Sequence, residues 1–183
     1  MTFLFGEPKL SNEELSQCLT WLGQHYKITT FQEKEADLYN NALVKYGGSM
    51  SIDSSASEEM VKVVKRLVQA ATECVSRIDN MTSIPQVASV THYAWRIVLA
   101  DYLAWVRAQC AAIEAVAGGM HPRGEYVAEL LQKAENSRKK AEKEEQKLLK
   151  RMIRSGATMN DFQKLVVNAA RAVTDENWQP SQE

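Results

Sequence analysis

HYAWRIVLADYLAWVRAQCAAIEAVAGGMHP, residues 92–122, is the most apolar part of the chain. A membrane-spanning helix needs roughly 20 predominantly apolar residues, and each charge at the bilayer centre costs about 2.5–3.5 kcal/mol. Four charged side chains interrupt this stretch: Arg96, Asp101, Arg107 and Glu114. Apolar residues recur every three or four positions from Trp95 to Ala117, which is the spacing of a helix face. The stretch therefore predicts a central core helix and not a membrane span.

Helix-start and helix-stop signals recur along the whole chain. A Ser or Thr followed three residues later by an acidic residue or Gln can form a capping box. This pattern begins at Ser11, Thr30, Ser55, Ser83 and Thr158. Glycines or an Asp-Asn pair, which commonly end helices, lie between these starts. Together with the apolar spacing, these signals predict helices over 11–27, 31–46, 56–79, 84–118, 123–155 and 158–175.

The low content of turn-forming residues agrees with long helices. The 183 residues contain only 8 Gly and 4 Pro, whereas an all-β protein of this size needs many more. We therefore expect an all-α fold, an antiparallel helical bundle of five or six helices. We expect a single domain over 1–183, with a flexible loop at 47–55 and a frayed tail after 178.

Charge and cysteine content narrow the class of protein. The formal net charge of −1 argues against a protein whose main task is to coat nucleic acid. Three widely spaced cysteines, Cys18, Cys74 and Cys110, indicate buried thiols in a reducing compartment. The first ten residues lack the basic and apolar regions of a secretory signal. These features together predict a cytoplasmic protein.

Motifs that carry catalysis are absent from the sequence. It contains no Walker loop, GxGxxG, GxSxG or HExxH pattern. The three histidines, His25, His92 and His121, lie in three different predicted segments, and none follows a Glu by three positions as a diiron bundle requires. We expect no catalytic residues, no metal site and no cofactor, and therefore not an enzyme.

A run of basic residues near the C-terminal third is the candidate binding site. On a helical wheel these residues fall within a sector of about 120° and form a stripe roughly 22 Å long. We call this set the basic stripe: Lys139, Lys143, Lys147, Lys150, Arg151 and Arg154. It could bind an anionic membrane surface, an acidic protein or a nucleic-acid backbone. Alternatively, it is a solvated helix held by pairs such as Glu135–Lys139, Arg138–Glu142 and Lys140–Glu144.

The same helix has an unusually polar buried side. Between Ala134 and Leu148 its only apolar residue is Ala141, and Arg138 and Glu145 occupy the apolar seam. The pattern predicts a long, charged helix that partly projects from the core, or that meets a partner there through polar contacts.

Residues 99–150 resemble the middle helix of BAR domains of the sorting-nexin type. In that family an aromatic-rich Asp-Tyr segment precedes an arginine and a helix rich in Lys and Glu, and here Asp101, Tyr102 and Arg123 occupy comparable places. The resemblance implies a dimeric antiparallel coiled coil that binds curved anionic membranes, with the basic stripe as the lipid contact.

Together these observations predict a non-catalytic helical interaction module, either an adaptor or an assembly subunit. A protein partner is expected, and a homodimer or an anionic membrane surface is compatible with the same helix surfaces. The alternatives are a BAR-like peripheral membrane protein and a helical subunit of a nucleoprotein assembly, although nucleic acid is the less favoured partner.

Overall fold

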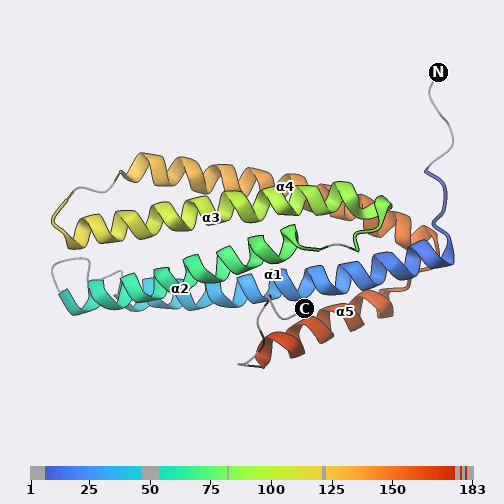
Figure 1. Cartoon of the computed structure of the whole chain (residues 1–183), viewed down its shortest axis with the longest axis horizontal. Coiled ribbons are helices and arrows are strands. Elements are labelled where there is room, and N and C mark those ends of the chain that lie inside the picture. The colour runs from blue at the N-terminus through green and yellow to red at the C-terminus, as the bar shows by residue number, and fades with distance from the viewer. Residues whose placement is uncertain are drawn as a thin grey trace, which may run out of the picture.

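The computed structural model describes residues 7–46, 54–81, 83–120, 123–175, 178 and 180. These residues form five α-helices and a short 3-10 helix: α1 (Asn12–Tyr46), α2 (Ser54–Asp79), η2 (Gln86–Ala88), α3 (Ser89–Ala117), α4 (Gly124–Arg154) and α5 (Met159–Thr174). Helices α1 to α4 run up and down the long axis, each beside the one before it, and α5 packs on α1 (Figure 1). The expected all-α antiparallel bundle is confirmed.

Helix α1 is one continuous helix, so the predicted break between 27 and 31 is wrong. The prediction rested on Thr30 as a helix cap. The hydroxyl of its neighbour Thr29 instead donates to the carbonyl oxygen of His25, at 3.3 Å, inside the helix. A threonine that bonds back by one turn is compatible with an unbroken helix. Ile28 and Phe31 are buried on either side of this point, so tertiary packing overrides the local capping signal.

Two apolar clusters form the core. The larger one joins α1, α2, α3 and α4 around Trp21, Leu22, Ile78, Leu99 and Met152, and α5 adds Val173. The smaller one fills the opposite end of the bundle between α1, α2 and α3, and includes Tyr39, Met60, Val64, Leu67 and Val106. Helix α3 lies between α2 and α4 and contributes to both clusters, as expected of the predicted central helix, and its buried residues lie between Thr91 and Val106.

Helix α4 lies along α3 over its length and does not project as the sequence predicted (Figure 1). The prediction was wrong because the seam lacks large apolar side chains. The structure buries small ones, Ala134 and Ala141, in place of large ones. Alanines allow two helices to approach closely, and the Oγ of Ser137 adds a hydrogen bond to the Asp101 carboxylate of α3, at 2.6 Å.

Several predicted helix ends are confirmed. Ser11 and Glu14 bond reciprocally at the start of α1, and Thr158 and Asp161 do the same at the start of α5. Gly156, with φ of 114°, ends α4 in a conformation that disfavours other residues. Of the predicted loop 47–55, residues 47–53 lie outside the described part, and Ser54 and Ser55 belong to α2. The predicted frayed tail also falls largely outside it.

The long helices are interrupted by charges or polar residues at short intervals. Within the described residues, none of them combines the length and the apolarity needed to cross a bilayer.

Substitutions at two adjacent residues of α4, one buried and one exposed, test how this helix packs on the core. Met152 is fully buried in the larger cluster, whereas Ile153 is 47% exposed. Met152→Ala is expected to lower the free energy of unfolding by about 2–5 kcal/mol, because it removes apolar contacts and leaves a cavity. Ile153→Ala is the matched control and should change it by less than about 0.5 kcal/mol. Urea denaturation of both variants measures the difference, and equal effects would contradict this position of α4.

Candidate functional site

Four of the six residues of the basic stripe share one shallow groove on the outer side of α4. Lys139, Lys143, Lys147 and Lys150 line a hollow of about 470 Å³, together with Glu142 and Gln146. All four lysines are exposed. The helix presents them together because their spacing of three and four residues returns to the same side of the helix. The opposite side of α4 is fixed to the core by Leu148 and Met152.

The two arginines of the stripe do not line this groove. The Arg151 guanidinium donates to the Pro8 carbonyl oxygen at 3.2 Å and lies 3.8 Å from the Glu7 carboxylate. It therefore holds the segment before α1. Arg154 donates to the carbonyl oxygen of Lys150 at 3.4 Å, close to the end of the helix. The binding surface supported by the structure is thus smaller than the predicted one.

Among the described residues, the ion pairs of α4 leave three of the groove lysines without a carboxylate partner. Glu135 and Glu142 both pair with Arg138, at 3.1 and 3.0 Å. Glu144 pairs with Lys147 at 2.7 Å. The predicted pair Arg138–Glu142 is therefore present, whereas Glu135 pairs with Arg138 in place of Lys139, and Glu144 pairs with Lys147 in place of Lys140. Within the described part of the chain, Lys139, Lys143 and Lys150 have no carboxylate within ion-pair distance.

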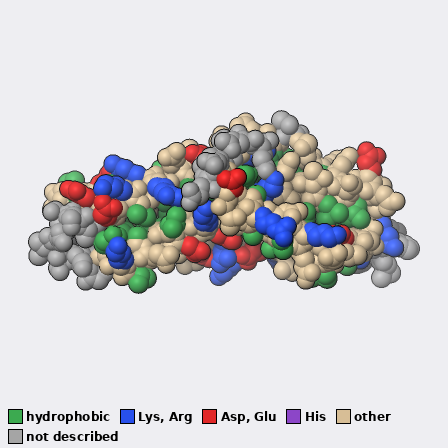
Figure 2. Space-filling model, turned by 90° about the horizontal axis from the view of Figure 1, so that it is seen from below, with side chains coloured by type: hydrophobic (Ala, Val, Ile, Leu, Met, Phe, Trp, Pro, Cys, Tyr) green, Lys and Arg blue, Asp and Glu red, His purple; other side chains and the backbone are tan. Residues whose placement is uncertain are grey.

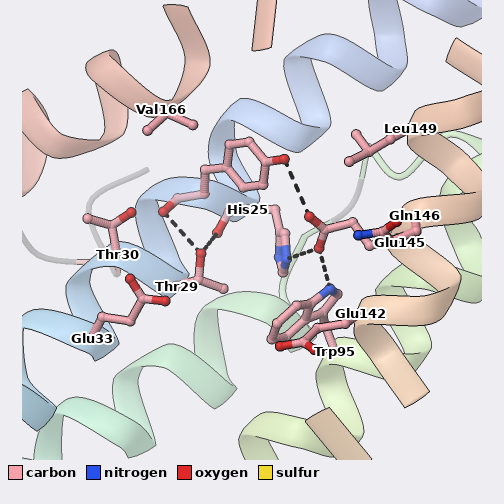
Figure 3. A pocket seen from close by; sticks show the side chains of 11 residues that line it. His25, Thr29, Thr30, Glu33, Trp95, Glu142, Glu145, Gln146, Leu149 and Val166 are labelled. Atoms are coloured by element: carbon pink, nitrogen blue, oxygen red, sulfur yellow. Dashed lines mark hydrogen bonds and ion pairs between the residues drawn. The ribbon is translucent and has the colours of Figure 1, made fainter. Parts of the chain in front are cut away.

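Glu145, one residue of the predicted polar seam, points inward from α4 to a cluster of aromatic side chains (Figure 3). Its Oε2 accepts a hydrogen bond from Trp95 Nε1 of α3 at 2.7 Å, and its Oε1 accepts one from the Tyr26 hydroxyl of α1 at 3.4 Å. Burial raises the pKa of this carboxyl group above its ordinary value, although the two hydrogen bonds act in the opposite direction. One carboxylate thereby connects three helices.

His25 lies beside Glu145 and is completely buried. Its ring stacks on Trp21 with 5.3 Å between ring centroids and packs against Trp95 at 5.2 Å. Burial, assisted by His92, lowers the pKa of His25 to about 3. The imidazole is therefore neutral at pH 7, and its Nε2, 3.9 Å from Glu145 Oε2, does not form a charged pair there. Neither ring nitrogen has a hydrogen-bond partner among the described residues.

His25, Tyr26, Trp95 and Glu145 line one side of a cavity of about 330 Å³ between α1, α3, α4 and α5. Thr29, Thr30, Glu33, Glu142, Gln146, Leu149 and Val166 complete its lining. No Lys or Arg is among the described residues that line it, whereas three carboxylates are. Glu142 and Gln146 also line the lysine groove. An acidic cavity and a basic groove thus lie side by side on α4.

Among the described residues, no group of three or more His, Cys, Asp or Glu is arranged to hold a metal ion. The three cysteines are free thiols, and burial raises the pKa of each above its ordinary value, which makes them poor nucleophiles at neutral pH.

Comparisons with protein-family models, with curated proteins and with solved structures find no match to this chain. The resemblance of residues 99–150 to a BAR-domain helix stays a prediction. In the structure these residues lie on two antiparallel helices, α3 and α4, joined at 118–123.

The sequence identified the lysines of the groove but not the aromatic side of the acidic cavity. Glu145 was recognisable as a charge in an apolar seam. Trp95 was assigned to the core and Tyr26 was not singled out, because nothing in their local sequence distinguishes an indole or phenol that donates to a buried carboxylate. His25 was interpreted as a partly buried histidine and not as a metal ligand, and its unpaired nitrogens depend on contacts from three helices.

The hydrogen bond from Trp95 to Glu145 can be tested by removing its donor. Trp95→Phe keeps an aromatic ring and removes the indole N–H. It is expected to lower the free energy of unfolding by about 1–3 kcal/mol more than the control Trp105→Phe, since it leaves the Glu145 oxygen without this donor. Trp105 is a partly buried tryptophan of the smaller cluster, and its indole nitrogen makes no hydrogen bond within the described residues. Chemical denaturation measures both; equal losses would contradict the role of Trp95.

The buried His25 predicts a specific pH dependence of stability. The unfolded state takes up a proton near pH 6.5, whereas folded His25 stays neutral down to about pH 3. The wild type therefore loses stability as the pH falls below 6.5, by up to about 1.4 kcal/mol per pH unit from this group. His25→Phe removes that loss. As the pH falls from 6.5 to 4.5, the free energy of unfolding of the variant should therefore rise relative to that of the wild type. Denaturation series at both pH values measure it, and parallel pH profiles would show that His25 titrates normally.

Proposed function

We propose that this protein is a non-catalytic helical interaction module, an adaptor or assembly subunit, that binds an acidic surface of a partner protein through the lysine groove of α4. The observation that carries the proposal is the set of three unpaired lysines, Lys139, Lys143 and Lys150, in one groove. The reducing, cytoplasmic setting expected from the sequence is compatible with three free thiols.

The groove is suited to binding because the side of α4 that carries its lysines is held outward by the packing of the helix. The buried side of α4, including Ala141, Leu148 and Met152, fixes the rotation of the helix. The lysines therefore share one direction before any partner arrives, and their charge is not neutralised by the protein itself. Complementary charge of this kind raises the rate of association and fixes the orientation of a partner.

The pattern of charge favours a protein over a membrane or a nucleic acid. The groove is edged by Glu142, and the adjacent cavity adds Glu33 and Glu145. A continuous anionic surface would bring negative charge against these carboxylates, whereas a protein can place its own carboxylates on the lysines alone. Elsewhere the two signs are mixed: Figure 2 shows basic and acidic side chains interspersed over the face seen from the side of α5.

Charge reversal tests the groove. Lys139→Glu/Lys143→Glu/Lys150→Glu should weaken the binding of a synthetic poly-glutamate peptide by about 10- to 100-fold at low salt, because repulsion replaces attraction at three positions. The matched control reverses three exposed lysines of other segments, Lys9, Lys45 and Lys164. Fluorescence anisotropy with labelled peptide measures the affinities, and circular dichroism checks that helix content is unchanged.

Parallel titrations with phosphatidylserine vesicles and duplex RNA separate the alternatives. Peptide binding that exceeds the binding of both other polyanions, and that depends on the groove, supports the proposal. Preferred binding of vesicles would overturn it in favour of the BAR-like function, and preferred binding of RNA in favour of the nucleoprotein one. If no polyanion binds at low salt, or if the control weakens binding equally, the groove is a solvated surface and the proposal is contradicted.

A further inference from the structure

The outer side of α3 carries an apolar stripe that the bundle leaves exposed. Its residues recur at alternating intervals of three and four positions, which is the spacing of a coiled-coil seam. We call the seven exposed residues the α3 stripe: Val90, Tyr93, Ile97, Ala100, Ala104, Arg107 and Ala111. All except the arginine are apolar or aromatic. A seam of this kind normally faces another helix.

The composition of α3 as a whole also indicates a covered helix. It is the most apolar of the five α-helices, and a helix that is apolar on all sides is normally buried on all sides. Here α2 and α4 flank α3, while Leu99 and Val106 face the core. Helix α5 packs on α1, on the far side of the bundle from α3 (Figure 1). Within the described part of the chain, the stripe therefore stays uncovered, which is typical of a surface that binds protein.

The stripe is complementary in size to a second copy of itself. A two-fold axis at Ala100 runs two α3 helices antiparallel, so that a residue before Ala100 meets a residue of the partner that lies about as far after it. Ile97, three positions before Ala100, then packs on the partner's Ala104, four positions after it. Val90 packs in the same way on the partner's Ala111. Each of these branched side chains faces an alanine, and Ala100 at the axis lets the two helices approach closely.

The single charge of the stripe has a complementary group in the same arrangement. Arg107 lies seven positions after Ala100, and Tyr93 lies seven positions before it. Among the described residues, Arg107 has no carboxylate within ion-pair distance. The two-fold axis places its guanidinium over the ring of the partner's Tyr93, and this favourable contact between a cation and an aromatic ring forms twice in a dimer.

The charges that border the stripe are already neutralised. On the side of α2, Lys65 pairs with Glu114 at 3.0 Å. On the side of α4, Lys133 pairs with Asp101 at 3.2 Å. These pairs leave little net charge to attract a polyanion and little to repel a second copy. An apolar centre within a polar rim is the ordinary arrangement of a protein interface.

We infer that the α3 stripe is a homodimer interface, in which the α3 helices of two copies pack antiparallel about a two-fold axis at Ala100. From Val90 to Ala111 the stripe is about 32 Å long, at a rise of 1.5 Å per residue. The surface formed by α3 and the adjoining sides of α2 and α4 is about 25 Å wide, given the usual spacing and diameter of helices. These dimensions give room for about 800 Å² per partner, as in a standard stable interface. No residue of the stripe lines the lysine groove, so a dimer presents two grooves.

Sedimentation equilibrium of the full chain, at concentrations from about 1 to 100 µM, tests the inference. The wild type should form a dimer of twice the 20.6 kDa chain mass, with a dissociation constant below about 10 µM. Ala100→Glu should raise that constant at least about 100-fold, because two carboxylates would meet at the axis. Ala128→Glu, at an exposed alanine of α4, is the matched control and should leave it unchanged. Circular dichroism checks that both variants keep the helix content of the wild type.

Substitutions of Tyr93 test the proposed register of the two helices. Tyr93 is 60% exposed, so the monomer should tolerate a charged residue there. Tyr93→Glu places a carboxylate beside the partner's Arg107, whereas Tyr93→Lys places a second cation there. The lysine variant should therefore dimerise at least about tenfold more weakly than the glutamate variant.

Cross-linking tests the position of the axis directly. A short bis-maleimide should link Ala100→Cys into a covalent dimer, because position 100 lies beside its own copy. Ala128→Cys carries the same three native cysteines and is the control for their background reaction.

The inference is overturned if the full chain stays monomeric up to about 100 µM, or if folded Ala100→Glu dimerises as tightly as the wild type. It is also overturned if the two Tyr93 variants dimerise equally well, or if Ala128→Cys is cross-linked as readily as Ala100→Cys. None of these outcomes affects the lysine groove, which is tested separately with poly-glutamate.

Discussion

The Glu145 carboxylate accepts one hydrogen bond from α3 and one from α1, and the position of α4 depends on it. Helices that follow one another in the chain pack side by side, so α4 lies against α3. Its relation to α1 rests on side chains that reach across: the Tyr26 hydroxyl and Trp95 indole meet at Glu145. Without a carboxylate there, buried polar groups of two other helices would lose their acceptor.

This constraint also explains the shape of the α3–α4 seam. Ala134, Ala141 and Leu148 follow one another at intervals of seven, so a narrow apolar line faces α3. Polar contacts flank it: Asp101 accepts from Ser137 at 2.6 Å and pairs with Lys133 at 3.2 Å. Small side chains bring the helices close, and the flanking polar bonds fix their register. The outer side of α4 is thereby free to carry lysines that no internal contact requires.

The sequence predicted the class of fold and the location of the lysines because both depend on local periodicity. It also placed Glu145 in the seam of α4. It predicted a projecting helix there because large apolar residues are missing, and close approach through alanines depends on the partner helix. The continuity of α1 past Thr30 was missed for a related reason: Ile28 and Phe31 are buried by other helices, and that burial outweighs a capping pattern. His25, Tyr26 and Trp95 meet only in three dimensions.

One wall of the acidic cavity, at Val166, is present because α5 packs on α1. A Cβ at Gly23 would come within 3.3 Å of Leu165 Cδ2, so a glycine at this position of α1 lets α5 approach the helix. That approach brings Val166, the next residue of α5, to the wall of the cavity that also contains His25 and Glu145. A larger residue at position 23 would press on α5 and change the cavity without touching its polar floor. The wall of the cavity at Val166 thus depends on the packing of α5 on α1, two helices that do not carry the carboxylate.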